Sequence, residues 1–468
     1  MLLRNIYIDK GLVFLIIISF ILRIVFVPFT SGSDIPQFAG FADTFLRHGF
    51  CFYKYADGSK YVSENWAYSW PYIYGPVLIF ILSFLRILTP EEIIHYWKNN
   101  NYYVFVPIQW IVAVKSIFVL FDLLVIYVLY VILDTYGLTR RKRLLLTSLY
   151  ALNPMTIYIS SIYGMFDQIA LFFFLLAIHF YRGIISGSKN NYALPGAFLA
   201  LSILTKQTMI FPSIFILLDI LYRSVRYTKK FLIILTSFVV ISILLVLPFE
   251  ITCPGSIFSL WNAVSRTSSP GYTLPVVYSF NGLSSLASYI NMCCGKDTLY
   301  LIIYWWVPTI VFLTLLFITY LETRDPYTIS LLSYIVFQTT YWRINHQYLV
   351  PGVASLILLF QLMKKCMRCR ILGIIIVILI GFWPIMFPTS WWAHVHIKEP
   401  NYFIWRLMDM FSLMIFDDLI YVLYALLLTI TQYLFIADSI IYLLQEKSLI
   451  IKKIVKDVTR SISLSFHR

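Results

Sequence analysis

Long apolar runs constrain the fold of this chain more than any other feature of its sequence. The runs GLVFLIIISFILRIVFVPF (11–29) and FLIILTSFVVISILLVLP (231–248) each reach the roughly 18 residues that a helix needs to cross a bilayer. Charged residues make up only 12% of the chain, whereas soluble domains contain about 25%. The sequence therefore predicts an all-α polytopic membrane protein whose residues 1–468 form one transmembrane domain.

The net charge of +14 would suit a nucleic-acid-binding protein, but the basic residues occur in short clusters between apolar runs. These clusters are TRRKR (139–143), YRSVRYTKK (222–230) and KKCMRCR (364–370). Clusters of this kind are typical of cytoplasmic loops under the positive-inside rule. We therefore expect no nucleic-acid partner, both termini in the cytoplasm, and a basic cytoplasmic tail at 441–468.

Twelve transmembrane helices fit the apolar pattern once one ambiguous run is resolved. If the run YIYGPVLIFILSFLRIL (72–88) crossed the bilayer, every later basic cluster would lie outside, so we interpret it as a segment that does not cross. This choice leaves outer segments at 30–107, 250–299 and 389–410. The expected spans are 11–29, 108–133, 144–163, 168–186, 192–206, 208–222, 230–249, 300–320, 327–346, 348–363, 371–388 and 411–440.

The first outer segment contains two patterns that predict interfacial helices. SDIPQFAGFADTFLRHG places Asp34 at the N-cap, Gln37 at the capping-box position and Gly49 at the end. TPEEIIHYWK repeats the pattern with Thr89 and Glu92. We expect both helices to be amphipathic and to lie on the membrane surface among the aromatic residues around them.

Two carboxylates lie near the outer ends of predicted spans. Asp167, in SSIYGMFDQIALFFFLLAIHF, follows a tight turn at Gly164; it either caps the next helix or lines an outward-facing cavity. Asp34 follows the first span and lies at the same membrane level, where it can act both as a cap and as a base. Asp43 is two and a half turns further along the helix, so we expect it on a solvated face.

Cations also gather at the outer ends of the spans. Lys206, in LSILTKQTMIFP, either extends to the membrane surface or holds an anion, and Arg343 and His346 lie in YWRINHQYLVP. Two acids and at least two cations on one face suit a lipid phosphate, with a carboxylate placed to deprotonate an acceptor hydroxyl. The residues that we expect to contact the acceptor or the outer loop are Asp43, Trp70 and Tyr74.

The cysteines predict little by themselves. Cys366 and Cys369 form a single CxxC in a basic loop; a zinc site usually needs a second ligand pair, so two reduced thiols are expected. A disulfide within the outer segments stays open, because no pairing follows from the sequence. The cysteines in those segments are Cys51, Cys253, Cys293 and Cys294.

Taken in order, several stretches resemble the GT-C class of glycosyltransferases, which use polyprenyl-phosphate-linked sugars. SGSDIPQFAGFAD resembles the start of the family's first outer loop, and the resemblance implies that Asp34 is the catalytic base. The resemblance implies a secondary site role for Asp167, which lies in NPMTIYISSIYGMFDQIALFFFLLA. It implies a phosphate-side role for Lys206, in LPGAFLALSILTKQTMIFP, and a site role for His346, in RINHQYLVP. YGPVLIF resembles another segment of the family's first outer loop. The resemblance to the family covers about residues 10–360 of this chain.

The resemblance implies inverting transfer of a hexose, with mannose or glucose favoured, from a polyprenyl-phosphate donor such as dolichyl phosphate sugar. The acceptor would be a lipid-linked glycan, a glycolipid or a protein on the extracytoplasmic side of the plasma membrane or endoplasmic reticulum. Lys206 and Arg343 would stabilise the departing phosphate, and no metal or other cofactor would be required, although Asp34, Asp167 and a phosphate could together hold a divalent metal. Two alternatives are a secondary transporter, which shares the span count but places charges nearer the midplane, and a lipid-linked glycan ligase or flippase.

Overall fold

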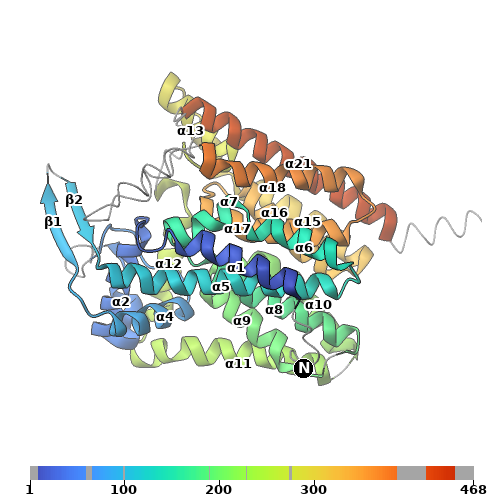
Figure 1. Ribbon diagram of the computed structural model, residues 1–468, viewed down its shortest axis with the longest axis horizontal. Helices are drawn as coiled ribbons and strands as arrows, with labels where there is room; N and C mark the ends of the chain where they lie inside the picture. Colours follow the sequence, from blue (N-terminus) through green and yellow to red (C-terminus); the bar gives the residue numbers. More distant parts are fainter. Residues whose placement is uncertain are drawn as a thin grey trace, which may run out of the picture.

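A computed structural model describes residues 9–58, 66–98, 101–188, 190–227, 229–272, 277–386 and 418–447. In these ranges the helices run side by side in one elongated bundle, with one two-stranded hairpin at its end (Figure 1). The chain is a helical polytopic membrane protein, since seven helices in the described part are long and apolar enough to cross a bilayer. The third outer segment, 389–410, and most of the basic tail, 441–468, lie outside the described residues.

The long apolar helices form the body of the bundle. They are α5 (Ile108–Asp134), α8 (Asp167–Ile185), α10 (Ile210–Tyr227), α11 (Lys229–Thr252), α15 (Trp306–Thr323), α18 (Met367–Met386) and α21 (Asp418–Lys447). Shorter apolar helices pack among them: α1 (Lys10–Ile24), α6 (Arg140–Ala151), α9 (Ala193–Thr205), α16 (Pro326–Thr340) and α17 (Leu349–Leu362). Each of the twelve predicted spans contains a helix, but these five are 12–15 residues long, so the number of crossings stays a prediction.

Several spans are interrupted near the same end of the bundle. After α6 the chain continues as α7 (Pro154–Ile157) and a π-helical turn, η3 (Tyr158–Tyr163), because Pro154 has no N–H with which to continue α6. The other interrupting turns are η4 (Gln207–Met209), α14 (Tyr300–Ile303) and η6 (His346–Tyr348). Breaks of this kind expose backbone polar groups, which membrane proteins tolerate only where protein or a cavity surrounds them.

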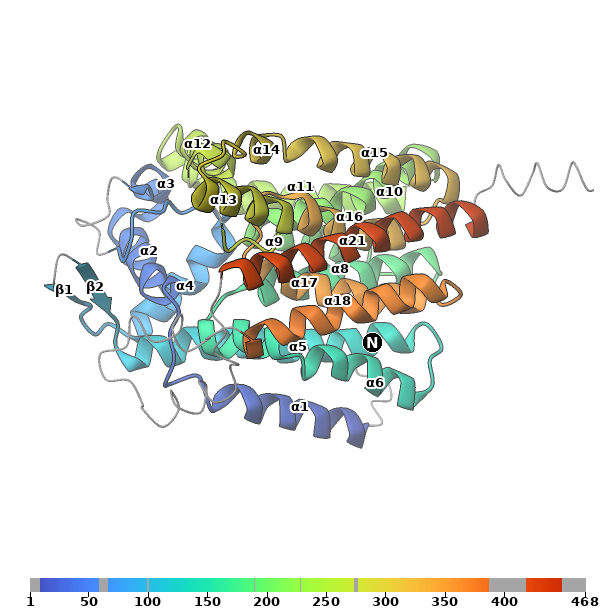
Figure 2. The same cartoon turned by 90° about the horizontal axis from the view of Figure 1, so that it is seen from above.

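The two ends of the bundle differ (Figure 2). One end carries the elements of the first two outer segments: α2 (Asp34–His48), η1 (Gly49–Cys51), α3 (Phe52–Tyr55), α4 (Pro76–Leu88), α12 (Ser256–Ser268), η5 (Pro270–Tyr272) and α13 (Gly282–Cys294). The connections from α5 to α6 and from α17 to α18, which hold two of the basic clusters, lie at the other end. The described parts of the outer segments and these basic clusters are therefore separated as expected.

The ambiguous run 72–88 forms α4, which has 13 residues. A helix of this length spans about 20 Å, less than the roughly 30 Å of a hydrocarbon core, but α6 and α9 are as short, so the non-crossing of residues 72–88 stays a prediction. Helix α4 packs against α2, where Arg86 Nε lies 2.7 Å from Asp43 Oδ1. Asp43 therefore holds two outer helices together and does not lie on a solvated face.

The prediction of a second interfacial helix at 89–98 is wrong. Residues Ile94–Lys98 form strand β1, which pairs antiparallel with β2 (Asn101–Phe105), with Ile94 opposite Phe105. The strands are rich in aromatic and β-branched residues, which favour a pleated surface. In the sequence two asparagines, a residue type common in hairpin turns, separate the strands.

The first interfacial helix exists as α2, but it does not lie on a surface. Ile35, Phe38 and Phe41 have at most 2% of their surface exposed, so the apolar stripe packs into the protein. Phe41 meets the ring of Trp66 edge-on at 4.9 Å. Burial of large apolar side chains contributes about 1.5–3 kcal/mol for each, which fixes α2 against the bundle.

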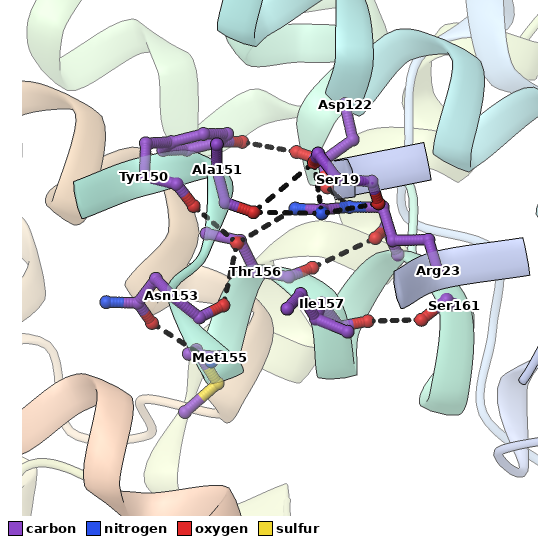
Figure 3. A network of polar contacts seen from close by, with 11 residues as sticks. Ser19, Arg23, Asp122, Tyr150, Ala151, Asn153, Met155, Thr156, Ile157 and Ser161 are labelled. Atoms are coloured by element: carbon purple, nitrogen blue, oxygen red, sulfur yellow. Dashed lines mark hydrogen bonds and ion pairs between the residues drawn. The ribbon is translucent and has the colours of Figure 1, made fainter. Parts of the chain in front are cut away.

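A charged network with no predicted role lies inside the bundle (Figure 3). Arg23 of α1 forms an ion pair with Asp122 of α5, with Nε and Oδ2 2.6 Å apart and both side chains fully buried. The guanidinium also donates to Ala151 O and Thr156 Oγ1, and Tyr150 OH donates to Asp122 Oδ1 at 2.7 Å. The network thus joins α1 and α5 to the interruption after α6.

The expectation of two reduced thiols in the CxxC is also wrong for this structure, which joins Cys366 and Cys369 in a disulfide. Their Cα atoms are 5.3 Å apart, within the range that a disulfide requires. The four cysteines of the outer segments are free.

Candidate functional site

A cavity of about 550 Å³ lies at the end of the bundle that carries α2 and α12. Asp34 is the only Asp or Glu, and Arg343 the only Lys or Arg, among the described residues that line it. Much of the remaining wall is aromatic. Its tyrosines and tryptophans are Tyr68, Trp70, Tyr74, Tyr163, Trp305, Tyr341 and Tyr348.

The structure brings most of the predicted site residues to this cavity. Those that line it are Asp34, Trp70, Tyr74, Arg343 and His346. Those absent from its lining are Asp43, which pairs with Arg86, and Asp167 and Lys206, which pair with each other. The predicted positions therefore converge on one end of the molecule, but they divide into a cavity set and a buried ion pair.

Asp34 is the first residue of α2, and its carboxylate does not cap the helix. The N-cap position belongs to Ser33, which makes no side-chain capping bond. Asp34 Oδ1 instead accepts a hydrogen bond of 2.6 Å from Tyr68 OH. Burial raises the pKa of Tyr68 well above its usual value, and the nearby Asp34 carboxylate raises this pKa further, so the phenol stays protonated and continues to donate.

Gln37 does not form the expected capping box either. Its Oε1 accepts from Tyr68 N at 3.1 Å, and its Nε2 donates to Trp70 O at 3.2 Å. The amide of Gln37 thus holds the backbone of the segment that covers Asp34. Sequence spacing alone could not distinguish this partner from the cap, because both use the same side-chain atoms.

Helix α5 anchors the backbone on both sides of Asp34. Lys115 Nζ donates to Thr30 O at 2.6 Å and to Thr30 Oγ1 at 2.8 Å. Trp110 Nε1 donates to Ile35 O at 2.9 Å. Lys115 and Trp110 are fully buried, so these contacts hold the start of α2 at a fixed place.

Two glycines allow the close approach of the chain around this point. Gly32 N donates to Tyr163 O at 2.8 Å, and a Cβ on Gly32 would lie 2.7 Å from that oxygen. Gly164 has a φ of +87°, which L-residues with side chains rarely adopt. The tight turn predicted before Asp167 is therefore confirmed.

Asp167 and Lys206 form a fully buried ion pair behind the cavity wall. Lys206 Nζ lies 2.6 Å from Asp167 Oδ1, with 1% and 0% of the two side chains exposed. Asp167 is the first residue of α8, so the predicted N-cap position falls on Phe166. Lys206 Nζ also lies 4.6 Å from the ring centre of Tyr348, a wall residue. Lys206 therefore neither extends to the membrane surface nor reaches the cavity directly.

We predict that Lys206→Met will destabilise the folded protein by about 3–5 kcal/mol, because it leaves Asp167 charged and buried without its partner. Adding Asp167→Asn to this variant should restore part of the loss. The free energy of unfolding in detergent micelles, measured for the two single variants and the double variant, tests this. Wild-type stability of Lys206→Met together with weakened binding of a phosphate ligand would instead assign Lys206 to ligand binding.

Arg343 connects the α16–α17 break, residues 341–348, to the first outer segment. Its guanidinium carbon lies 4.8 Å from the ring centre of Trp70, a cation–π distance. Burial raises the pKa of Tyr74, the Asp34 carboxylate raises it further, and the Arg343 guanidinium lowers it. Tyr74 is therefore within electrostatic range of both charged groups, so the carboxylate and the guanidinium act on the same cavity.

Metal ligands are sparse around the cavity. Asp34 is the only carboxylate and His346 the only imidazole among the described lining residues. The described ranges contain no group of three or more His, Cys, Asp or Glu side chains that could hold a metal ion. Metal independence stays a prediction from the resemblance.

Comparison with known proteins adds no further assignment. No protein-family model matches the chain, and no curated protein matches it. A function has to be argued from the site itself, because a fold alone does not define one.

Proposed function

We propose that this protein is an inverting glycosyltransferase that transfers a hexose, mannose or glucose, from a polyprenyl-phosphate donor to a lipid-linked glycan, glycolipid or protein. One observation carries the proposal: a single cavity of about 550 Å³ presents a carboxylate and a guanidinium between aromatic walls. A carboxylate suits proton removal, a guanidinium suits a phosphate, and aromatic faces suit the apolar face of a sugar ring.

In the proposed reaction the acceptor hydroxyl oxygen attacks the anomeric carbon of the sugar from the face opposite the phosphate. The bond between that carbon and the phosphate oxygen breaks, and the phosphate leaves with the electron pair. Because attack and departure occur on opposite faces, the new glycosidic bond has inverted configuration, and Asp34 takes the acceptor proton. The hydrogen bond from Tyr68 to Asp34 Oδ1 orients the carboxylate that takes the proton.

Arg343 is proposed to stabilise the charge on the departing phosphate, as oriented cations do in many active sites. Lys206 acts from behind the wall, because Asp167 already neutralises it. The buried pair holds the position of Tyr348 and keeps the cavity floor in place. In this proposal Asp167 and Lys206 support the site, whereas the resemblance implies that they act in it directly.

We further propose twelve crossing helices, both termini in the cytoplasm, and a cavity that opens on the extracytoplasmic side of the plasma membrane or endoplasmic reticulum. The separation of the basic loops from α2 and α12 supports this orientation. Labelling of single cysteines introduced near residues 142 and 268 with a membrane-impermeant maleimide tests it, since the two sites should react from opposite sides.

The function is tested with the purified protein in lipid vesicles that contain labelled polyprenyl-phosphate mannose or glucose and a membrane lipid extract. The proposal expects label to move from the donor to a new lipid or protein product. Uptake of a solute into sealed vesicles without any transfer of label would favour the transporter interpretation instead. Boiled protein and an unphosphorylated polyprenyl sugar are the controls.

A further inference from the structure

Four residues of the cavity lining have a buried polar atom without a hydrogen-bond partner in the part of the chain that the structure describes. They are Gln207 Oε1, Thr208 Oγ1, His346 Nε2 and Gln347 Oε1. More than nine-tenths of the surface of Thr208 and of Gln347 is buried. Buried polar atoms are nearly always paired, and leaving one unpaired costs about 1–3 kcal/mol. Four such atoms around one cavity are available to the polar groups of a ligand.

The four residues come from two helix breaks that face each other. Gln207 and Thr208 belong to the α9–α10 break, residues 206–209, and His346 and Gln347 to the α16–α17 break. Lys206 Nζ, in the first break, lies 4.6 Å from the ring centre of Tyr348 in the second. Beside the breaks, Phe211 and Phe337 of the neighbouring helices stack at 4.6 Å. The two breaks therefore form one polar floor.

The chemistry of this floor differs from that of the phosphate side. Two amides and a hydroxyl carry no charge, and each type of group can both donate and accept. A phosphate prefers cations, and the cation of the lining is Arg343. A sugar hydroxyl also both donates and accepts, so it pairs with an amide in either orientation. The terminal torsion of a Gln side chain is broad, which lets its amide turn toward such a group.

We propose that Gln207, Thr208 and Gln347 form a subsite for the hydroxyl groups of the transferred sugar and determine which hydroxyls a donor must carry. This rests on the proposed function. His346 supports the same floor: its ring packs at 4.4 Å against Tyr163 and nearly parallel to Trp383 at 5.9 Å, so its position is fixed. The ligand class is a neutral polyhydroxylated ring attached to a lipid phosphate.

The test uses Gln207→Leu and Gln347→Leu, which keep the side-chain size but remove the amides. Each should lower kcat/KM for the sugar donor about 10-fold, the size of one or two neutral hydrogen bonds. Binding of bare polyprenyl phosphate should not change. Wild-type protein should discriminate against some single-deoxy donors, and each variant should lose part of that discrimination. Gln338→Leu is the matched control, since Gln338 is also a buried amide without a partner but does not line the cavity.

Two failures can be told apart. If wild-type protein transfers sugar and both variants keep its kcat/KM and its deoxy-donor preferences, the subsite is overturned and the proposed function stands. If wild-type protein transfers no sugar, the proposed function fails, and the proposed subsite is then tested by ligand binding alone. In that case the subsite survives only if sugar-bearing lipid phosphate binds more tightly than bare lipid phosphate and the two variants remove the difference.

Discussion

Replacing Asp34 with Asn is expected to lower kcat for sugar transfer by a factor of about 10²–10⁴, the range that a positioned general base contributes. The amide keeps the size of the carboxylate and can still accept from Tyr68, whose OH donates to Asp34 Oδ1 in the wild-type protein. It cannot take the acceptor proton at neutral pH. Because the substitution removes an interaction of the transition state, the KM for the donor should change much less than kcat.

The matched control is Asp134→Asn, the same chemical change at the last residue of α5. This is the end of α5 opposite to Trp110, which contacts the Asp34 segment. The Asp134 side chain is 62% exposed and does not line the cavity, so turnover should stay at the wild-type level. Thermal unfolding of both variants in detergent shows whether they are folded. Wild-type turnover of folded Asp34→Asn would remove this residue from the role of base.

The largest effect on stability is expected at the buried pair of Arg23 and Asp122. Asp122→Ala leaves a guanidinium inside the bundle without its counter-ion, and losing one partner of a buried pair costs about 3–5 kcal/mol. Because Tyr150 also loses its acceptor, we expect the loss at the upper end of that range. The free energy of unfolding in mixed micelles is the measurement.

A double-mutant cycle separates the interaction from the burial of a single charge. Arg23→Met and Asp122→Leu should each destabilise the protein, whereas the double variant should recover most of the stability, because apolar side chains of similar volume often replace a buried ion pair at little cost. The cycle should therefore give a large coupling energy. Additive effects of the two substitutions would mean that Arg23 and Asp122 stabilise the bundle independently.

The sequence predicted well those features that depend on local pattern and on sidedness. The apolar runs predicted the helices, the basic clusters predicted which loops share an end, and a helix begins at Asp34, one residue earlier than the predicted cap implies. Asp34 and Arg343 line one cavity although more than 300 residues separate them. They could be placed together because each follows the predicted outer end of a predicted span, and such ends share one level.

The partners of the polar side chains could not be predicted in this way. Asp34, Gln37 and Asp167 all fit the pattern of helix caps, yet each bonds to a residue at least 31 positions away in the sequence. A cap and a distant donor satisfy the same oxygen, so only the packing of the other helices decides between them. Lys115 left a usable signal, since a charge inside an apolar run usually has a definite partner.

The anchoring of the Asp34 segment has a consequence for how this region can diverge among related proteins. Lys115 and Trp110 donate hydrogen bonds to the backbone carbonyl oxygens of Thr30 and Ile35. Every amino acid has the same carbonyl oxygen. These two backbone contacts therefore do not depend on which side chains stand at residues 30 and 35, although Thr30 Oγ1 also accepts from Lys115 and the Ile35 side chain is fully buried. We expect the two donors, Lys115 and Trp110, to tolerate little substitution, so that a search for relatives by local similarity around Asp34 would miss the contacts that place it.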